Sequence, residues 1–329
     1  MDVQLKLLYE NPVFRSYLFY TAILTIKMMF MSLLTIRQRV MNNSFVSEED
    51  AMYLKGMVSR TNEHVERVRR GHRNDMENIY LFFVIAFAYI WTDPNPFLAN
   101  FLFFAFTVAR IVHTCVYTVV IMPQPIRGRA WLVGFFVTGY MAVRTLLHFC
   151  VKVSSSYLHL SVYLNSMVNT TGSVKPVENF ILTLSNPAFG VYLLCACLLV
   201  LKMMGVTLLT IYNRFRHKAF ICPEDAKWLR GQVVVNDTVE RIRRAHQNDL
   251  ENIPIFLAAG FAYLWTHPYV WLASILYIGF TILRVLHTIV YALIILPQPT
   301  RAMLWLGGFL ITGYMAIHSA IYVFIYLVT

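Results

Sequence analysis

Long hydrophobic runs alternate with short polar segments over most of the chain. A bilayer core about 30 Å thick is crossed by roughly 20 helical residues, and eight runs in the sequence have about that length. The pattern therefore predicts eight transmembrane helices. Their expected ranges are 13–37, 76–93, 97–122, 129–151, 187–212, 250–266, 269–296 and 302–327.

The eight runs form two copies of one pattern, which indicates an internal duplication. The segment VERVRRGHRNDMENI at 65–79 returns 174 residues later as VERIRRAHQNDLENI at 239–253. Upstream, LLTI at 33–36 returns 175 residues later at 208–211. We therefore expect an all-α integral membrane protein made of two tandem, parallel four-helix transmembrane bundles. The first repeat is expected at 1–151 and the second at 187–329, with a linker at 152–186 on the lumenal side.

Composition excludes a soluble enzyme, because 58% of the residues are hydrophobic and only 14% are charged, against about 25% charged in an average protein. The net charge of +11 comes from Lys and Arg that gather between the first and second runs of each repeat. Such segments face the cytoplasm, so both repeats have the same orientation. Asn169, in a glycosylation sequon of the linker, would then be lumenal.

Two other classes of site are not expected. No basic run lies on a polar domain that could bind a duplex, so the charge does not indicate nucleic-acid binding. The five cysteines are scattered and form neither a disulfide framework nor a metal-ligand cluster. We therefore expect no metal site.

Charged residues inside a membrane are costly and need a reason. Arg110, His113 and Tyr117 recur at i, i+3 and i+7 on one helical stripe, and Arg70, Asn74 and Glu77 form a similar stripe on the preceding helix. Such stripes can serve as polar contacts between helices. Arginines outnumber acids here, however, so the stripes also suit a small ligand with several carboxylates.

Arg127 follows the Pro-Gln-Pro turn before the fourth run and allows two interpretations. It can be an ordinary positive anchor at the membrane surface, or its guanidinium can stabilise a thiolate. A thiol with a pKa near 8.5 is mostly protonated at pH 7, so a thiol-transfer enzyme needs such a group.

Several motifs taken together, in order and twice, resemble a known family. VERVRRGHRNDMENI, AFAYIWTDPNPF, ARIVHTCVY and PQPIR are similar to the membrane-associated proteins in eicosanoid and glutathione metabolism, in the microsomal glutathione transferase and prostaglandin E synthase branch. The resemblance implies four-helix units that assemble as trimers in the endoplasmic reticulum membrane, with the mitochondrial outer membrane as a second location. It also implies that glutathione binds between neighbouring units. Two repeats per chain do not divide evenly into one trimer.

The resemblance also assigns roles residue by residue. Arg127 and Arg301 match the arginine credited with activating the thiol. Asp50 and Asp225 match a secondary acidic position. The residues that match glutathione ligands are Arg39, Arg70, Arg73, Asn74, Glu77, Arg110, His113 and Tyr117 in the first repeat, and Arg214, Arg244, Asn248, Glu251, Arg284, His287 and Tyr291 in the second. Gln247 replaces Arg73, so the second site is expected to bind glutathione more weakly or in another pose.

The resemblance favours a glutathione transferase that conjugates hydrophobic electrophiles from the bilayer and also reduces lipid peroxides. A glutathione-dependent isomerase of the prostaglandin E synthase type is the alternative within the family. That synthase has a serine after the thiol-activating arginine, whereas Gly128 and Ala302 stand there in this chain. A non-catalytic scaffold and a small-anion transporter are alternatives from other classes.

Overall fold

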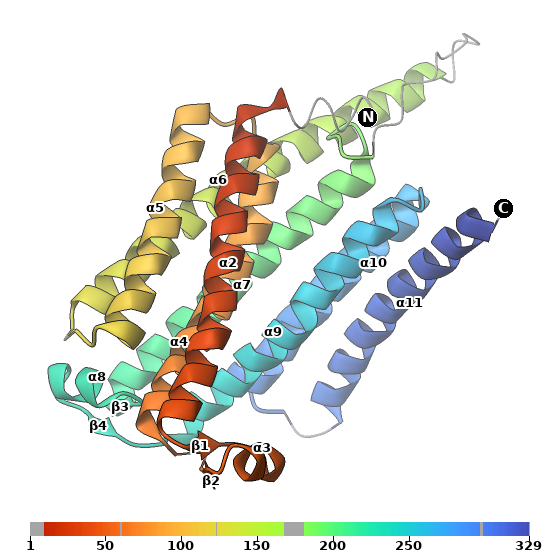
Figure 1. Cartoon of the computed structure of the whole chain (residues 1–329). Coiled ribbons are helices and arrows are strands. Elements are labelled where there is room, and N and C mark those ends of the chain that lie inside the picture. The colour runs from red at the N-terminus through yellow and green to blue at the C-terminus, as the bar shows by residue number, and fades with distance from the viewer. Residues whose placement is uncertain (1–9, 60, 123, 168–180, 297–298, 329) are drawn as a thin grey trace. The chain divides into compact units, whose positions relative to one another are not determined.

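The computed structural model describes residues 10–59, 61–122, 124–167, 181–296 and 299–328. Contacts divide the chain into two compact units, of which one ends at Tyr140 and the other begins at Met141. Each unit consists mainly of long helices (Figure 1).

The first unit holds four long helices that follow one another along the chain. They are α2 (Pro12–Met41), α4 (Glu63–Ile90), α5 (Pro96–Thr114), which continues in the π-helical turn η1 (Cys115–Val119), and the beginning of α6 (Ile126–Met167). α2 packs against both α4 and α5. The start of α6 lies against α5, because a Cβ atom at Gly134 would be 3.5 Å from the ring of Phe106.

The second unit repeats this order. Its helices are α7 (Pro187–His217), α9 (Asp237–Leu264), α10 (Val270–Thr288) with the π-helical turn η2 (Ile289–Leu293), and α11 (Thr300–Val328). α7 packs against α9 and α10, and α11 packs against the same two helices.

Side-chain caps explain where several helices begin. The backbone N–H groups in the first turn of a helix have no partner within the helix, and an N-cap side chain can accept their hydrogen bonds. The Oδ1 atoms of Asn11, Asn62 and Asn95 do this for the helices that follow them. Pro12 and Pro96 occupy the first helical position, where the missing N–H costs nothing.

A small motif between the first two long helices of each unit lies outside the sequence prediction. Strand β1 (Ser44–Phe45) pairs in parallel with β2 (Met57–Val58) around helix α3 (Glu48–Tyr53). The second unit repeats it as β3 (Ala219–Phe220), α8 (Pro223–Trp228) and β4 (Gln232–Val233). A Cβ atom at Gly56 would lie 2.2 Å from the ring of Phe45, so only glycine fits there.

Among the residues that the structure describes, six helices are long and apolar enough to cross a membrane. These segments are Pro12–Met41, Pro96–Val119, Ile126–Val151, Pro187–His217, Val270–Leu293 and Thr300–Ile325. The chain is therefore a multi-pass membrane protein. The two other predicted spans, 76–93 and 250–266, fall largely in the apolar C-terminal parts of α4 and α9, and their crossing of the bilayer stays a prediction. α6 continues to Met167, so the start of the predicted linker is helical; Asn169 lies outside the described residues.

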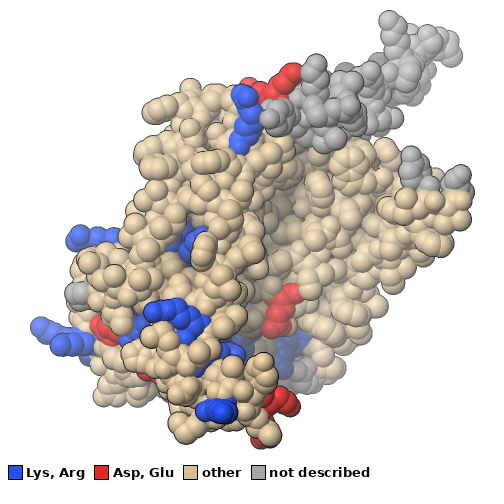
Figure 2. Space-filling model, in the orientation of Figure 1, with Lys and Arg blue, Asp and Glu red and all other residues tan. Residues whose placement is uncertain are grey.

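The surface agrees with a membrane environment. Large apolar side chains such as Phe19, Phe30 and Phe136 are at least 60% exposed, which a water-facing surface does not favour. On the face shown in Figure 2, the surface along the helices is mostly uncharged. Many of the charged side chains gather at the end that carries α3 and β1 in Figure 1.

Candidate functional site

A buried network of charged groups lies between α2, α4 and α5 of the first unit. Asp75 and Arg110 are both 0% exposed, and Arg110 Nη2 donates to Asp75 Oδ1 at 2.6 Å. Lys27 forms an ion pair with Asp75, and Thr114 Oγ1 donates to Asp75 Oδ2 at 3.2 Å. Arg110 Nη2 also donates to Asn74 Oδ1 at 2.8 Å, so the network orients one of the predicted ligand residues.

The second unit holds the same network in nearly the same geometry. Arg284 Nη2 donates to Asp249 Oδ1 at 2.6 Å and to Asn248 Oδ1 at 2.8 Å. Lys202 pairs with Asp249, and Thr288 Oγ1 donates to Asp249 Oδ2 at 3.3 Å. Buried carboxylates need such compensation, because their transfer from water is expensive.

A second cluster in the first unit surrounds Tyr117, which the π-helical turn η1 carries. Arg70 Nε donates to the Tyr117 hydroxyl at 3.2 Å, and the guanidinium carbon of Arg127 lies 4.3 Å from the centroid of the Tyr117 ring. This distance allows a cation–π interaction. The ring of His113 lies 5.9 Å from that of Tyr117. Arg70 is also held by Glu63, through an ion pair of 2.6 Å.

Part of this cluster returns in the second unit. The guanidinium carbon of Arg301 lies 4.4 Å from the ring centroid of Tyr291, and the ring of His287 stacks on that of Tyr291 at 5.8 Å. Each unit therefore brings its predicted thiol-activating arginine onto its predicted ligand tyrosine.

Comparison with known proteins identifies the relationship. The family model described as the MAPEG family matches residues 17–147 and again 192–321.

The chain belongs to the MAPEG family.

Curated MAPEG relatives are single-repeat proteins in length. The chain is 44% identical over 147 residues to microsomal glutathione S-transferase 1 of Mus musculus, which covers 43% of this chain and 94% of the relative. It is 39% identical over 149 residues to the protein of the same name from Homo sapiens, with 44% of this chain and 96% of the relative covered. It is 37% identical over 113 residues to prostaglandin E synthase of Homo sapiens, with 34% and 74% covered.

The MAPEG site residues predicted from sequence fall into distinct groups in the structure. One group surrounds Tyr117 and contains Arg70, His113 and Arg127. The other is the network of Asp75, to which Arg110 and Asn74 belong. Arg110 on α5 thus forms polar contacts with α4, which is one of the two roles that the sequence suggested for these stripes. Binding of glutathione by any of these residues stays a prediction.

Other predicted residues of the first unit are carried by α2, α3 and α4. Arg39 is half-buried near the end of α2, and Asp50 is exposed in α3. Within the part of the chain that the structure describes, no hydrogen bond or ion pair is seen between either residue and Tyr117. Arg73 and Glu77 are half-buried on α4, and Arg214 and Asp225 occupy the positions of Arg39 and Asp50 in the second unit.

Sequence reasoning missed the centre of the buried network. Lys27 and Asp75 were not assigned to the site, although Lys27 stands alone in an apolar run and returns as Lys202. A lysine in the middle of a predicted span needs a buried partner, and this signal indicates that an acidic partner exists without saying which residue it is. Nearby on α4, burial lowers the pKa of His72, while the carboxylate of Asp75 opposes this effect.

Proposed function

We propose that this MAPEG protein is a membrane-bound glutathione transferase with its active site at the cytoplasmic end of the repeat. The observation that carries the proposal is the contact of two arginines with Tyr117, Arg70 at the hydroxyl and Arg127 over the ring. Two guanidinium groups therefore meet at one tyrosine side chain. The similarity to proteins named microsomal glutathione S-transferase 1 supports the same function.

Buried polar atoms without a partner in the first unit suit an anionic ligand. Arg110 Nε, Arg110 Nη1 and His113 Nδ1 are buried and have no hydrogen-bond partner among the described residues, and the same holds for Arg39 Nε. Such groups cost free energy unless a partner is supplied. Glutathione carries two carboxylates for arginine and an ammonium group for a carboxylate such as Glu77.

Arg127 and Arg301 are proposed to stabilise the glutathione thiolate. The thiol loses its proton to solvent, and the thiolate sulfur then forms a bond to an electrophilic carbon while the leaving group departs with its electron pair. Only the thiolate is nucleophilic, so a cation that lowers the pKa of the bound thiol raises the rate. The same thiolate can reduce lipid peroxides that arrive from the bilayer.

A glutathione-dependent isomerase is the second candidate, favoured by the 37% identity to prostaglandin E synthase. An isomerase returns glutathione unchanged, whereas a transferase consumes it. We place the protein in the endoplasmic reticulum membrane, in an oligomer built from trimer-like arrangements of repeats. Its presence in the mitochondrial outer membrane stays a prediction.

The test is glutathione conjugation to a generic aryl halide by the detergent-purified full chain. The Arg127→Ala/Arg301→Ala double variant should lose nearly all of the wild-type rate, while Arg37→Ala, which changes an exposed arginine away from the site, should keep it. A wild-type protein that is folded but consumes no glutathione would contradict the transferase. An unchanged rate in the double variant would contradict the role of the two arginines.

A further inference from the structure

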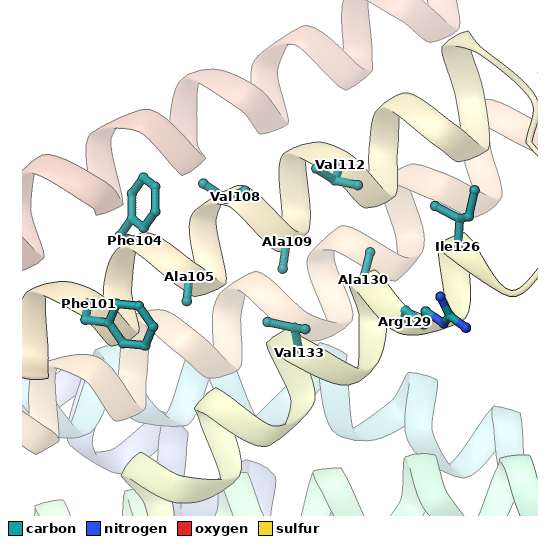
Figure 3. Close-up of a pocket in the computed structure, with 10 residues that line it drawn as sticks. All are labelled: Phe101, Phe104, Ala105, Val108, Ala109, Val112, Ile126, Arg129, Ala130 and Val133. Carbon is teal, nitrogen blue, oxygen red and sulfur yellow. The ribbon is translucent and has the colours of Figure 1, made fainter.

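An apolar groove of about 460 Å³ runs between α5 and the beginning of α6 in the first unit (Figure 3). Phe101 and Phe104 lie toward one end of the groove, and Arg129 lies toward the other. Apart from the Arg129 side chain, the lining is made of aliphatic and aromatic side chains. The Tyr117 cluster is not part of this lining.

Small residues make room for the groove. Ala109 on α5 and Ala130 on α6 are 6% and 8% exposed, so they form its floor. Phe101 and Phe104 are 56% and 51% exposed and remain open to the surroundings of the helices. Because α5 and α6 are apolar enough to cross a membrane, those surroundings are lipid chains, and the groove is open to them.

The length of the groove matches one leaflet of a bilayer. Its α5 wall runs from Phe101 to Val112, a rise of about 16 Å at 1.5 Å per residue. Half of a hydrocarbon core about 30 Å thick is about 15 Å. An acyl chain that follows the groove from Arg129 would therefore run about 16 Å along α5 to Phe101.

The positive charge of Arg129 favours a lipid with an anionic head group. Arg129 is exposed in the first turn of α6, and no acidic side chain of the described residues forms an ion pair with it. The positive end of the helix dipole adds to its charge. Anionic lipids are concentrated in the cytoplasmic leaflet, which is the side predicted for this end of α6.

The second repeat has a different lining at the positions that correspond to the groove. Leu283 and Leu304 replace Ala109 and Ala130, and Met303 replaces Arg129. Leu283 lies against Gly307, which replaces Val133 of the groove lining, because a Cβ atom at Gly307 would lie 2.9 Å from the Cδ1 atom of Leu283. The two alanines and the arginine thus occur together in the first repeat, whereas the second has two leucines and a methionine at these three positions.

We propose that this groove binds one anionic phospholipid of the cytoplasmic leaflet, with an acyl chain between α5 and α6 and the phosphate against Arg129. The proposal does not depend on the glutathione chemistry, since none of the groove residues belongs to the glutathione site.

The test is native mass spectrometry of the full chain, equilibrated in detergent with equal amounts of phosphatidylserine and phosphatidylcholine. The wild type should retain one lipid per chain, with about a fivefold preference for phosphatidylserine, as expected for a single arginine near the surface. Arg129→Met should reduce this preference to about one. The Ala109→Leu/Ala130→Leu variant should lose both lipids, and the reciprocal Leu283→Ala/Met303→Arg/Leu304→Ala variant should gain a second bound lipid.

Several results would overturn the proposal. They are a wild type without head-group preference, unchanged retention in the Ala109→Leu/Ala130→Leu variant, and displacement of phosphatidylserine by an equal amount of a free fatty acid. If the wild type retains no lipid and the Ala109→Leu/Ala130→Leu variant dissociates from its oligomer, the groove is a protein interface instead. Because Arg129 is exposed, the Arg129→Met variant should fold normally, and helical circular dichroism with the elution volume checks this for each variant.

Discussion

The two repeats keep the same buried network but differ at the rim of their candidate sites. In the first repeat this rim consists of Glu63, Arg70 and Arg73. Asp75 and Asp249 have the same partners in both units, within 0.1 Å for the three hydrogen bonds compared. The rim does not follow this symmetry. The comparison indicates that the buried network is the constant part of the two repeats, whereas the positions of the rim have changed between them.

The difference begins on the second long helix of each repeat. In the first repeat, Arg70 is held between Glu63 and Tyr117. Its equivalent Arg244 is exposed, and the position of Glu63 is taken by Asp237, whose side chain is shorter by one methylene. We therefore infer that the first repeat presents the better-ordered site.

Gln247 in the second repeat strengthens this contrast. Its Nε2 atom donates to Glu251 Oε1 at 3.3 Å, and it stands where the first repeat has Arg73. The second rim thus lacks one cation and engages its acidic residue internally. Both changes weaken the attraction for an anion.

The largest expected effect would test the shared interior. Asp75→Ala leaves Lys27 and Arg110 buried without their carboxylate, and loss of one partner in a buried pair costs about 3–5 kcal/mol. Asp249→Ala should cost about the same. Thermal unfolding in detergent measures both, with Asp50→Ala at an exposed position as the control. A large difference between the two variants would show that the interiors are not equivalent.

Single substitutions of the proposed thiolate arginines should separate the two sites. Arg127→Ala should lower kcat for conjugation by about 100-fold at the first site, the usual effect of removing one preorganised charge-stabilising donor. If the first site carries most of the activity, Arg301→Ala should have a much smaller effect on the total rate. Steady-state kinetics at saturating glutathione gives both values. Equal losses would mean that the repeats contribute equally.

Exchange of the rim residues should move affinity between the sites. Gln247→Arg adds a charge-assisted hydrogen bond to an anion, so it should tighten glutathione binding at the second site by about tenfold. Arg73→Gln should weaken the first site to a similar extent. Isothermal titration with glutathione measures the two affinities, and Gln247→Glu serves as the charge-reversed control. Identical titrations for wild type and Gln247→Arg would remove position 247 from the site.

The smallest effect concerns the support of Arg70. Glu63→Asp shortens a side chain that is half exposed, and exposed ion pairs contribute at most about 1 kcal/mol. The KM for glutathione should therefore rise by about twofold while kcat stays constant. Glu63→Gln, which keeps the length and removes the charge, tells whether reach or charge matters. A lowered kcat in Glu63→Asp would assign Arg70 a role in the chemical step.

Most of the helical architecture followed from the sequence. The repeat and the long apolar runs predicted each long helix, because apolar runs of membrane length leave few other folds. Arg70, Tyr117 and Arg127 could also be grouped in advance from the motifs that contain them. The role of Tyr117 as the ring on which Arg127 packs required the coordinates.

Three features could not be foreseen. β1 and β2 are two residues long, too short to show a strand period. The partner of Lys27 is remote in sequence, and Asp75 seemed one acid among many charges on a cytoplasmic segment. α6 runs on to Met167 because the polar residues after 151 do not include a strong helix breaker.

The π-helical turns that carry Tyr117 and Tyr291 have a historical consequence. Both interrupt the third long helix at matching positions, Cys115–Val119 and Ile289–Leu293, and such a turn accommodates one additional residue in an α-helix. The same insertion is not expected to arise twice at one place. It was therefore already present in the ancestral single repeat, and the duplication that produced this chain copied the turn together with its tyrosine.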